Sequence, residues 1–298
     1  MELVKKIDMH AHAWRNPGPP LPRGYVWIRP EELMEAYDRL GVEKGVLLPL
    51  VSPESVYSIV TSETVEEIVD QYPDRFFWFC SVDPRVLDNS LNSEVDYLVR
   101  YYKERGAKGL GEITANIAFD DPRVYRLLAA CEKYDMPITI HIGHTDGAYG
   151  LIDELGLPRL EKVLQTFPNL KVLGHSQRFW SHIGSDVTEE TRHGFPSGKV
   201  GPGGRVVELM RKYPNLYGDM SALSGYNAIT RDPEFGYAFL EEFQDKLFFG
   251  VDMTSFENLE GNSTKLSAYL DDAVLNGKIS QDVYYKVSRG NALKLLGE

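Results

Sequence analysis

Two histidines near the start of the chain are the first residues whose types and spacing suggest chemistry. His10 and His12 close a short apolar stretch, residues 5–12, that suits a β-strand. Side chains two positions apart on a strand point to the same face, so both imidazoles would project together from the strand end. Two imidazoles held in this way form half of a metal site. The alternative is a pair of exposed histidines near a flexible terminus, and the rest of the chain has to decide between them.

Other histidines and carboxylates also follow short apolar stretches. They stand at or just beyond the ends of predicted strands, and they are Glu112, His141, His144, His175, Asp219 and Asp252. The sequence has only seven histidines, and His10, His12, His141 and His175 all fall at strand ends. Imidazole and carboxylate ligands without thiolates suit zinc, manganese, iron or cobalt. We therefore expect these side chains to converge on a divalent metal.

The strands that would carry these residues alternate with helical patterns. Eight short apolar strands are predicted, at residues 5–12, 45–50, 75–82, 108–113, 137–142, 170–174, 216–220 and 246–251. Helices are expected to begin near Pro30 and Ser62 and to cover residues 90–105, 121–134, 157–167, 206–213, 233–243, 265–275 and 281–296, and a loop-rich insertion is expected over 176–204. Strand–helix alternation repeated eight times predicts a (β/α)8 TIM barrel, with the strand ends on its catalytic face. A doubly wound open sheet is the alternative, and we expect one domain over residues 1–298.

Composition limits the possible partners and the location. The net charge of −12 repels phosphate backbones and argues against nucleic acid as the main partner. No apolar stretch is long enough to span a membrane, and no signal peptide is evident. Cys80 and Cys131 are too few for a disulfide framework and stand in apolar surroundings. We therefore expect a cytoplasmic protein that acts on a small molecule.

These residues resemble the motifs of a known family. The opening His-x-His, the strand-end His141, Gly174-His175, Gly218-Asp219-Met220-Ser221 and the late Asp252 are similar to those of the amidohydrolase superfamily. The resemblance extends over the full length and is to the amidohydrolase-2 branch, which includes enzymes similar to aminocarboxymuconate-semialdehyde and resorcylate decarboxylases. It implies a TIM barrel and a divalent metal, most simply zinc, with manganese, iron or cobalt as alternatives.

The resemblance also implies roles for the strand-end residues. His10, His12, His141 and Asp252 would hold a first metal ion. His175 would be a catalytic histidine, as in the decarboxylases, or a ligand of a second ion. Glu112 occupies the position at which hydrolases similar to TatD have a bridging carboxylate; its alternative role is an ion pair at the barrel rim. One or two ions per chain are therefore expected, and homodimers are common on this fold.

Three function classes follow from this assignment. In a hydrolase, metal-activated water would attack a lactone, amide or ester, and Asp252 would pass the proton to the leaving group. In a non-oxidative decarboxylase, the metal would fix a small aromatic or unsaturated acid, and Asp252 or His175 would move a proton to or from the reacting carbon. The third class is a metal-binding protein without activity, which the complete ligand set disfavours. Hydrolysis is our first prediction and decarboxylation the alternative.

The expected substrate is acidic, which calls for an arginine, because a guanidinium binds a carboxylate at two points. Arg178 is the first candidate, and Arg15 and Arg23 are others in the loop after the first strand. His144 and Asp146 could contact substrate beyond the fifth strand. The remaining candidates for the pocket wall are aromatic or imidazole side chains, namely Trp14 in the first loop and Trp180, His182 and His193 in the insertion. Asp8 could orient one of the ligand histidines.

Overall fold

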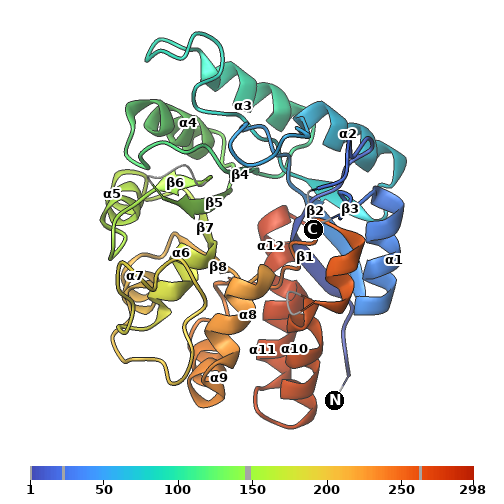
Figure 1. Ribbon diagram of the computed structural model, residues 1–298, viewed down its shortest axis with the longest axis vertical. Helices are drawn as coiled ribbons and strands as arrows, with labels where there is room; N and C mark the ends of the chain where they lie inside the picture. The colour runs from blue at the N-terminus through green and yellow to red at the C-terminus, as the bar shows by residue number, and fades with distance from the viewer. Residues whose placement is uncertain (1, 22–23, 145–148, 262–263) are drawn as a thin grey trace.

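The fold is a (β/α)8 barrel with a ring of parallel strands inside and helices outside (Figure 1). The structure is a computed structural model that describes residues 2–21, 24–144, 149–261 and 264–298. The ring strands are β1 (Lys6–Ala11), β2 (Val42–Leu47), β3 (Phe76–Trp78), β4 (Leu110–Ile113), β5 (Ile138–Gly143), β7 (Val172–His175), β8 (Leu216–Asp219) and β9 (Leu247–Phe248). A two-residue strand, β6 (Leu151–Ile152), adds to the edge of β5 beyond the ring.

Backbone hydrogen bonds close the ring on both sides. The strands order as β1-β2-β3 and as β4-β5-β7-β8-β9. Cys80 N donates to Gly109 O at 2.9 Å and joins the β3 side to the β4 side. Met9 N donates to Phe249 O at 3.0 Å and joins β1 to the β9 side. A closed ring excludes the open doubly wound sheet that was the alternative, and it brings the carboxyl ends of all eight strands to one face.

The helices pack around this ring. They are α1 (Pro30–Leu40), α2 (Ser62–Gln71), α3 (Val95–Glu104), α4 (Pro122–Lys133), α5 (Pro158–Thr166), α6 (Gln177–Trp180), α7 (Arg205–Lys212), α8 (Ala222–Thr230), α9 (Pro233–Glu242), α10 (Leu266–Leu275), α11 (Gln281–Tyr285) and α12 (Asn291–Leu296), with short helical turns η1 (Ser181–Ile183), η2 (Phe256–Glu260) and η4 (Lys286–Gly290). The helix α1 begins at Pro30, whose ring suits the first turn of a helix, and it ends at Gly41, which adopts the left-handed backbone conformation.

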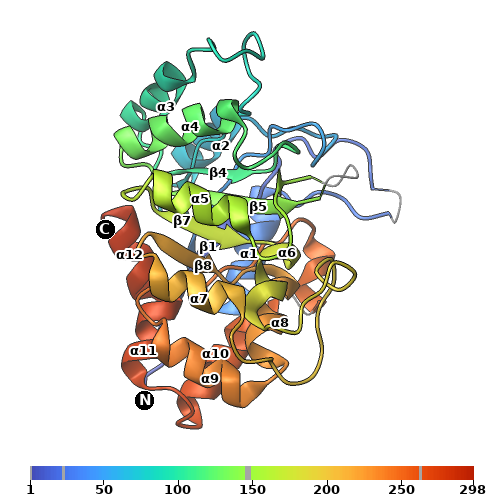
Figure 2. The same ribbon diagram turned by 90° about the vertical axis from the view of Figure 1, so that its left-hand side faces the viewer.

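The barrel interior is apolar at its amino-terminal end. Ile7, Met9 and Phe79 pack there in a buried cluster, which Ala292 and Leu296 of α12 also join. The helix α12 therefore covers this end of the ring, near the C-terminus in Figure 2. A second and larger cluster fills the layer between the strands and the outer helices. The apolar cluster closes this end of the barrel. The polar side chains at the carboxyl ends of the strands therefore lie at the other end, which is open.

The eight strands and most of the helices lie where the sequence predicts them. Three differences concern the later part of the chain. The helix α8 was not expected, because Gly225 interrupts its pattern in the sequence. The insertion over 176–204 contains α6 and the turn η1. The helix expected over 281–296 consists of α11, a π-helical turn and α12, since the turn carries Gly290, a poor helix former.

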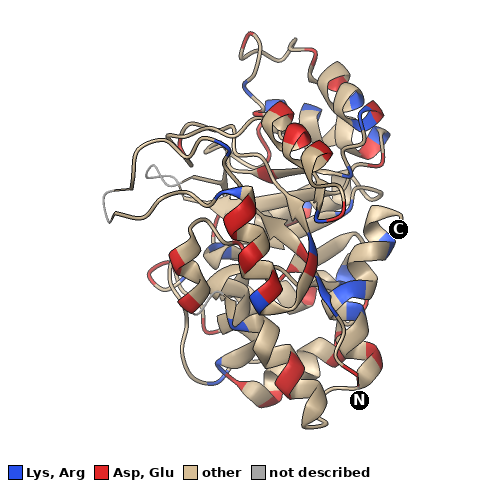
Figure 3. Ribbon diagram, turned by 90° about the vertical axis from the view of Figure 1, so that its right-hand side faces the viewer, with Lys and Arg blue, Asp and Glu red and all other residues tan. Residues whose placement is uncertain are grey.

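Charged residues lie largely on the outer helices. Figure 3 shows Asp and Glu positions along these helices, with Lys and Arg positions among them. Many of them form ion pairs across neighbouring elements, such as Arg289 with Glu43 at 2.7 Å. Within the described part of the chain, no helix combines the length and the apolar character that crossing a membrane requires.

Gly45 in β2 tests the packing beneath the site. A Cβ atom at Gly45 would lie 2.0 Å from Oη of Tyr37, whose hydroxyl donates to Asp8 at 2.7 Å. We expect Gly45→Ala to lower the free energy of unfolding by about 1–3 kcal/mol, because the buried ring has no room to move. Denaturant unfolding measures this. Gly194→Ala is the control, since its new Cβ would meet only Thr191 O at 3.8 Å, and equal stability losses in both variants would contradict the packing argument.

Candidate metal centre

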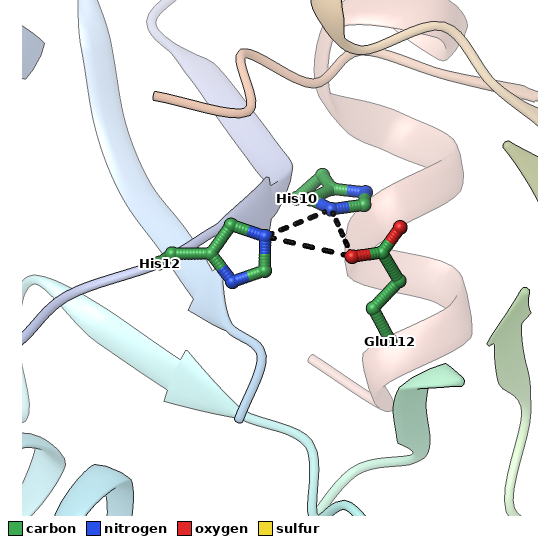
Figure 4. A group of neighbouring side chains, drawn as sticks. All are labelled: His10, His12 and Glu112. Carbon is green, nitrogen blue, oxygen red and sulfur yellow. Dashed lines mark hydrogen bonds and ion pairs between the residues drawn. The ribbon is translucent and has the colours of Figure 1, made fainter. Parts of the chain in front are cut away.

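His10, His12 and Glu112 converge at the centre of the open barrel face (Figure 4). The Nε2 atoms of His10 and His12 are 3.2 Å apart. Glu112 Oε2 lies 3.7 Å from His10 Nε2 and 3.8 Å from His12 Nε2. All three side chains are buried. Three donor atoms thus face a common point from β1 and β4.

The other nitrogens of the two histidines fix the protonation of the rings. His10 Nδ1 donates to Asp219 Oδ2 at 2.6 Å, and His12 Nδ1 donates to Leu48 O at 2.9 Å. A carboxylate and a carbonyl oxygen accept only, so each Nδ1 carries a proton, and each Nε2 is the atom that faces the centre. Burial opposes protonation of His10, but Asp219 and Asp252 hold its pKa well above the ordinary value, so a proton lies between the two Nε2 atoms when no metal is bound. A divalent ion would take the place of that proton. The donor set therefore fits a divalent metal ion.

Two further groups share these residues. Glu112 Oε1 is 2.6 Å from His141 Nδ1 and 3.8 Å from His175 Nε2. Asp252 Oδ1 is 3.4 Å from His12 Nε2, and Oδ2 is 3.7 Å from His175 Nε2. The donor atoms fall into three overlapping sets, His10–His12–Glu112, His10–His175–Asp252 and Glu112–His141–His175. Glu112 belongs to two of them, and His141 groups with Glu112 and His175.

The buried carboxylates make the centre strongly negative. Burial by itself would raise the pKa of Glu112, but attraction to His141 and hydrogen bonding to His10 hold it well below its usual range. Burial likewise opposes ionisation of Asp219, yet His10 holds the pKa of that carboxyl below its ordinary value. Burial, together with the nearby His10, lowers the pKa of His175 to about 4, which keeps its imidazole neutral. Ionised oxygens and a neutral imidazole are the forms that bind a cation.

Neighbouring polar groups hold the ligands in place. Ser221 Oγ lies 2.9 Å from His175 Nδ1, and Ser221 N donates to Asp219 Oδ1 at 3.0 Å. Asp8 was expected to orient a histidine ring; its carboxylate instead accepts from His10 N and Val251 N, both at 2.9 Å. The register of β1 against β2 shifts between Asp8 and Ala11, so the simple alternation of a strand does not hold there. Asp8 therefore fixes the backbone of His10 and does not contact its ring.

A pocket of about 380 Å³ opens over the centre. The residues that line it are His12, Trp27, Leu50, Ser55, Val56, Glu112, His141, Tyr149, Asp252, Thr254 and Asn258. Trp14, the expected wall residue, is only 1% exposed and stacks behind Trp27 at 4.5 Å, with its indole N–H donating to Ser58 O. Trp27 of the same loop therefore forms the wall. Tyr149, whose ring centre is 4.4 Å from that of His141, was not anticipated.

The remaining candidates lie around the pocket or away from it. Arg178 Nε donates to His193 Nδ1 at 2.9 Å, and the His193 ring lies 4.6 Å from that of His144. Arg15 donates instead to Glu67 O and Gln71 on α2. The indole N–H of Trp180 donates to Asp219 O at 2.8 Å, and Nε2 of His182 accepts from Gly156 N at 3.1 Å. Arg23 and Asp146 lie outside the described residues. Substrate contact by Arg178 and His144 stays a prediction.

Asp219 tests how far the surroundings of His10 control metal binding. We expect Asp219→Asn to weaken zinc affinity by about 10–100-fold, because the ionised partner that fixes the Nδ1–H of His10 becomes neutral. Competition with a chromophoric chelator measures the change. Asp245→Asn at the other end of the barrel is the matched control. An unchanged zinc affinity in Asp219→Asn would contradict the proposed orientation of His10.

Comparison with known proteins agrees with this architecture. The family model for amidohydrolases matches residues 7–297, nearly the whole chain. The chain belongs to the amidohydrolase family. No curated protein sequence matches it significantly. Among solved structures, an amidohydrolase from Burkholderia multivorans is similar at 14% identity and TM-score 0.66, with 99% of each chain covered.

Two more structures with this fold are described as different enzymes. A probable 2-pyrone-4,6-dicarboxylic acid hydrolase from Acinetobacter baumannii shares 14% identity, with TM-score 0.61 over 99% of this chain and 100% of that one. A dihydroxybenzoic acid decarboxylase from Polaromonas sp. JS666, solved with manganese, shares 16% identity, with TM-score 0.59 over 99% and 97% of the two chains. At these identities the similarity shows the barrel fold alone, and the reaction has to be inferred from the residues of the site.

Proposed function

We propose that this amidohydrolase family member is a metal-dependent hydrolase that cleaves a lactone, amide or ester bond in a small molecule. One observation carries the proposal: His10 and His12 point their Nε2 atoms at each other across 3.2 Å, while each Nδ1–H is already donated to a fixed acceptor. A proton shared by the two Nε2 atoms satisfies this arrangement without metal, and a divalent ion that displaces the proton would bind both nitrogens. Zinc is the first candidate, with manganese, iron or cobalt as alternatives.

The side chains divide between two adjacent subsites. His10, His12 and Asp252 would hold one ion, and His141 and His175 the other, with Glu112 between them. The resemblance in sequence groups His141 with the first ion, but its 2.6 Å contact with Glu112 favours the second. A divalent ion in such a site lowers the pKa of a bound water towards about 7 and polarises a carbonyl oxygen.

Asp252 is placed to move the proton. Its side chain is 20% exposed, lines the pocket, and approaches His12 and His175 through its two oxygens. A carboxylate there would take the proton of the attacking water and give it to the leaving group. His175, buried with its Nδ1 beside Ser221 Oγ, would keep a neutral imidazole towards the centre. Trp27 and Tyr149 would limit the access of bulk water from the sides.

Decarboxylation of a small aromatic or unsaturated acid is the alternative, since the same fold carries such an enzyme. The second subsite around Glu112 supports hydrolysis instead, because a pair of ions positions a water and a carbonyl together. The acidic substrate expected from the sequence stays a prediction, as the described pocket lining has no lysine or arginine. A cytoplasmic location is part of the proposal, because Cys80 and Cys131 are buried free thiols.

A substrate panel tests the proposed reaction. Zinc-loaded protein is incubated with matched esters, amides, lactones and hydroxybenzoic acids, and both acid release and carbon dioxide are measured. We expect release of the acid from at least one ester, lactone or amide and no carbon dioxide. Carbon dioxide from a hydroxybenzoic acid, without hydrolysis of any other compound, would replace the proposal by its alternative.

A further inference from the structure

Two aromatic side chains stand on opposite walls of the pocket. Trp27 stacks on Trp14, which lies beside His12, the residue after β1, with 6.1 Å between ring centres. Tyr149 lies over His141 of β5. In a ring of eight strands, β1 and β5 face each other across the barrel axis. The space between these rings therefore suits a flat apolar group.

Asn258, on the turn η2 after β9, contributes a polar group to a third wall. Its Oδ1 accepts from Thr254 N at 3.1 Å, from Ser255 N at 3.0 Å and from Thr254 Oγ1 at 3.3 Å. Both backbone donors require an oxygen at this position, so the orientation of the amide is fixed. The Nδ2 group is on the other side of the amide and makes no hydrogen bond with a described residue.

We propose that Asn258 determines specificity by donating its Nδ2–H groups to an uncharged oxygen acceptor of the substrate, such as a ketone, amide or ether. The apolar part that carries this acceptor lies between Trp27 and Tyr149. This inference rests on the proposed function for the position of the reacting bond, but the binding it describes occurs without turnover. An amide held in a turn by its own oxygen loses little entropy when it binds, which makes it an effective selector.

The charges around the pocket favour a neutral acceptor over a carboxylate. Glu112 and Asp252 line the pocket on the side of the metal centre. Within the described lining, the side chains on the other walls are neutral or apolar, as Leu50, Val56 and Ser55 show. At the wall formed by Asn258, a carbonyl oxygen is satisfied by the neutral amide donor, whereas a carboxylate there would need a cationic side chain, and the described lining has no lysine or arginine.

Two small phenols provide the test, since 4-hydroxyacetophenone carries an acetyl group, and with it the acceptor oxygen, that phenol lacks. Phenol and 4-hydroxyacetophenone are titrated into zinc-loaded protein by calorimetry, with no bond to be cleaved. We expect the wild-type protein to bind 4-hydroxyacetophenone about 10-fold more tightly than phenol, and Asn258→Asp to lose this preference, because its carboxylate keeps the turn contacts but has no donor. Glu257→Gln, an exposed change of charge in the same turn, should keep the preference.

The outcomes separate this inference from the proposed reaction. Equal affinities of the wild-type protein for the two phenols would overturn the role of Asn258, whether or not the variant folds. A preference that persists in Asn258→Asp would overturn it too. If no compound of the substrate panel is hydrolysed but the preference for 4-hydroxyacetophenone is present and depends on Asn258, the hydrolase proposal is rejected. The role of Asn258 in specificity is then retained.

Discussion

Replacing Asp252 by asparagine is expected to lower kcat by about 10²–10⁴-fold on any substrate that the protein hydrolyses. Asparagine keeps the size and one oxygen of the side chain but cannot accept and release the proton of the attacking water. The backbone favours this exchange, because residue 252 has a φ of 58°, in the left-handed region that Asp and Asn adopt most readily after glycine. The loss should therefore reflect chemistry and not misfolding.

Steady-state kinetics with matched metal loading measures the effect of Asp252→Asn. The control is Asp272→Asn on α10, an exposed carboxylate far from the pocket lining, which should keep the wild-type rate. A kcat of Asp252→Asn within a few-fold of wild type would exclude Asp252 as the proton carrier, and with it the hydrolytic scheme and the form of the decarboxylative scheme that uses Asp252.

Glu112→Gln is expected to remove one of the two metal ions and most of the activity while the barrel stays folded. Glu112 belongs to two of the three donor groups, as His10 and His175 do, and it is the carboxylate among the three, with one oxygen towards His141 and the other towards His10 and His12. Glutamine offers a single neutral oxygen, and its amide donor would face an imidazole nitrogen. Zinc content per chain is measured by elemental analysis, together with the circular dichroism spectrum and the thermal midpoint.

Glu104→Gln on the exposed side of α3 is the control for this variant. If Glu112→Gln keeps its full metal content and rate, the bridging role is wrong, and Glu112 is only an ionised partner of His141. If one ion is lost and the rate persists, the second ion is dispensable and a single ion is sufficient for the reaction.

The fold could be predicted because each strand has its own apolar stretch and six of the eight end at a histidine or a carboxylate. The positions of His10, His12, Glu112, His141 and His175 at the open end of the barrel follow from strand ends alone, since the carboxyl ends of parallel strands meet on one face. The strand ends do not predict which of these residues share a metal ion. Which nitrogen of a histidine faces the centre depends on acceptors such as Leu48 O, which no spacing in the sequence identifies.

The pocket wall was less predictable, because loops are positioned by contacts distant in sequence. The loop after β1 was expected to form a wall, yet the choice between its two tryptophans depends on Ile28 N donating to Thr254 O at 2.9 Å, which brings Trp27 beside the loop after β9. Asn258 has no motif around it and is recognised only by the donors that surround its Oδ1. Such residues become visible only when hydrogen-bond partners are known.

The most direct measurement is the number of metal ions bound by the purified chain. The protein is stripped with a chelator, dialysed against buffered zinc and analysed for zinc per chain, beside the variant in which His10 and His12 are both alanine. Two facing imidazoles, a shared Glu112 and a second histidine pair predict stoichiometric zinc in the wild-type protein and the loss of at least one ion in the double variant. Absence of stoichiometric binding of zinc, manganese, iron or cobalt to the wild-type chain, or equal metal content in the double variant, would contradict the account.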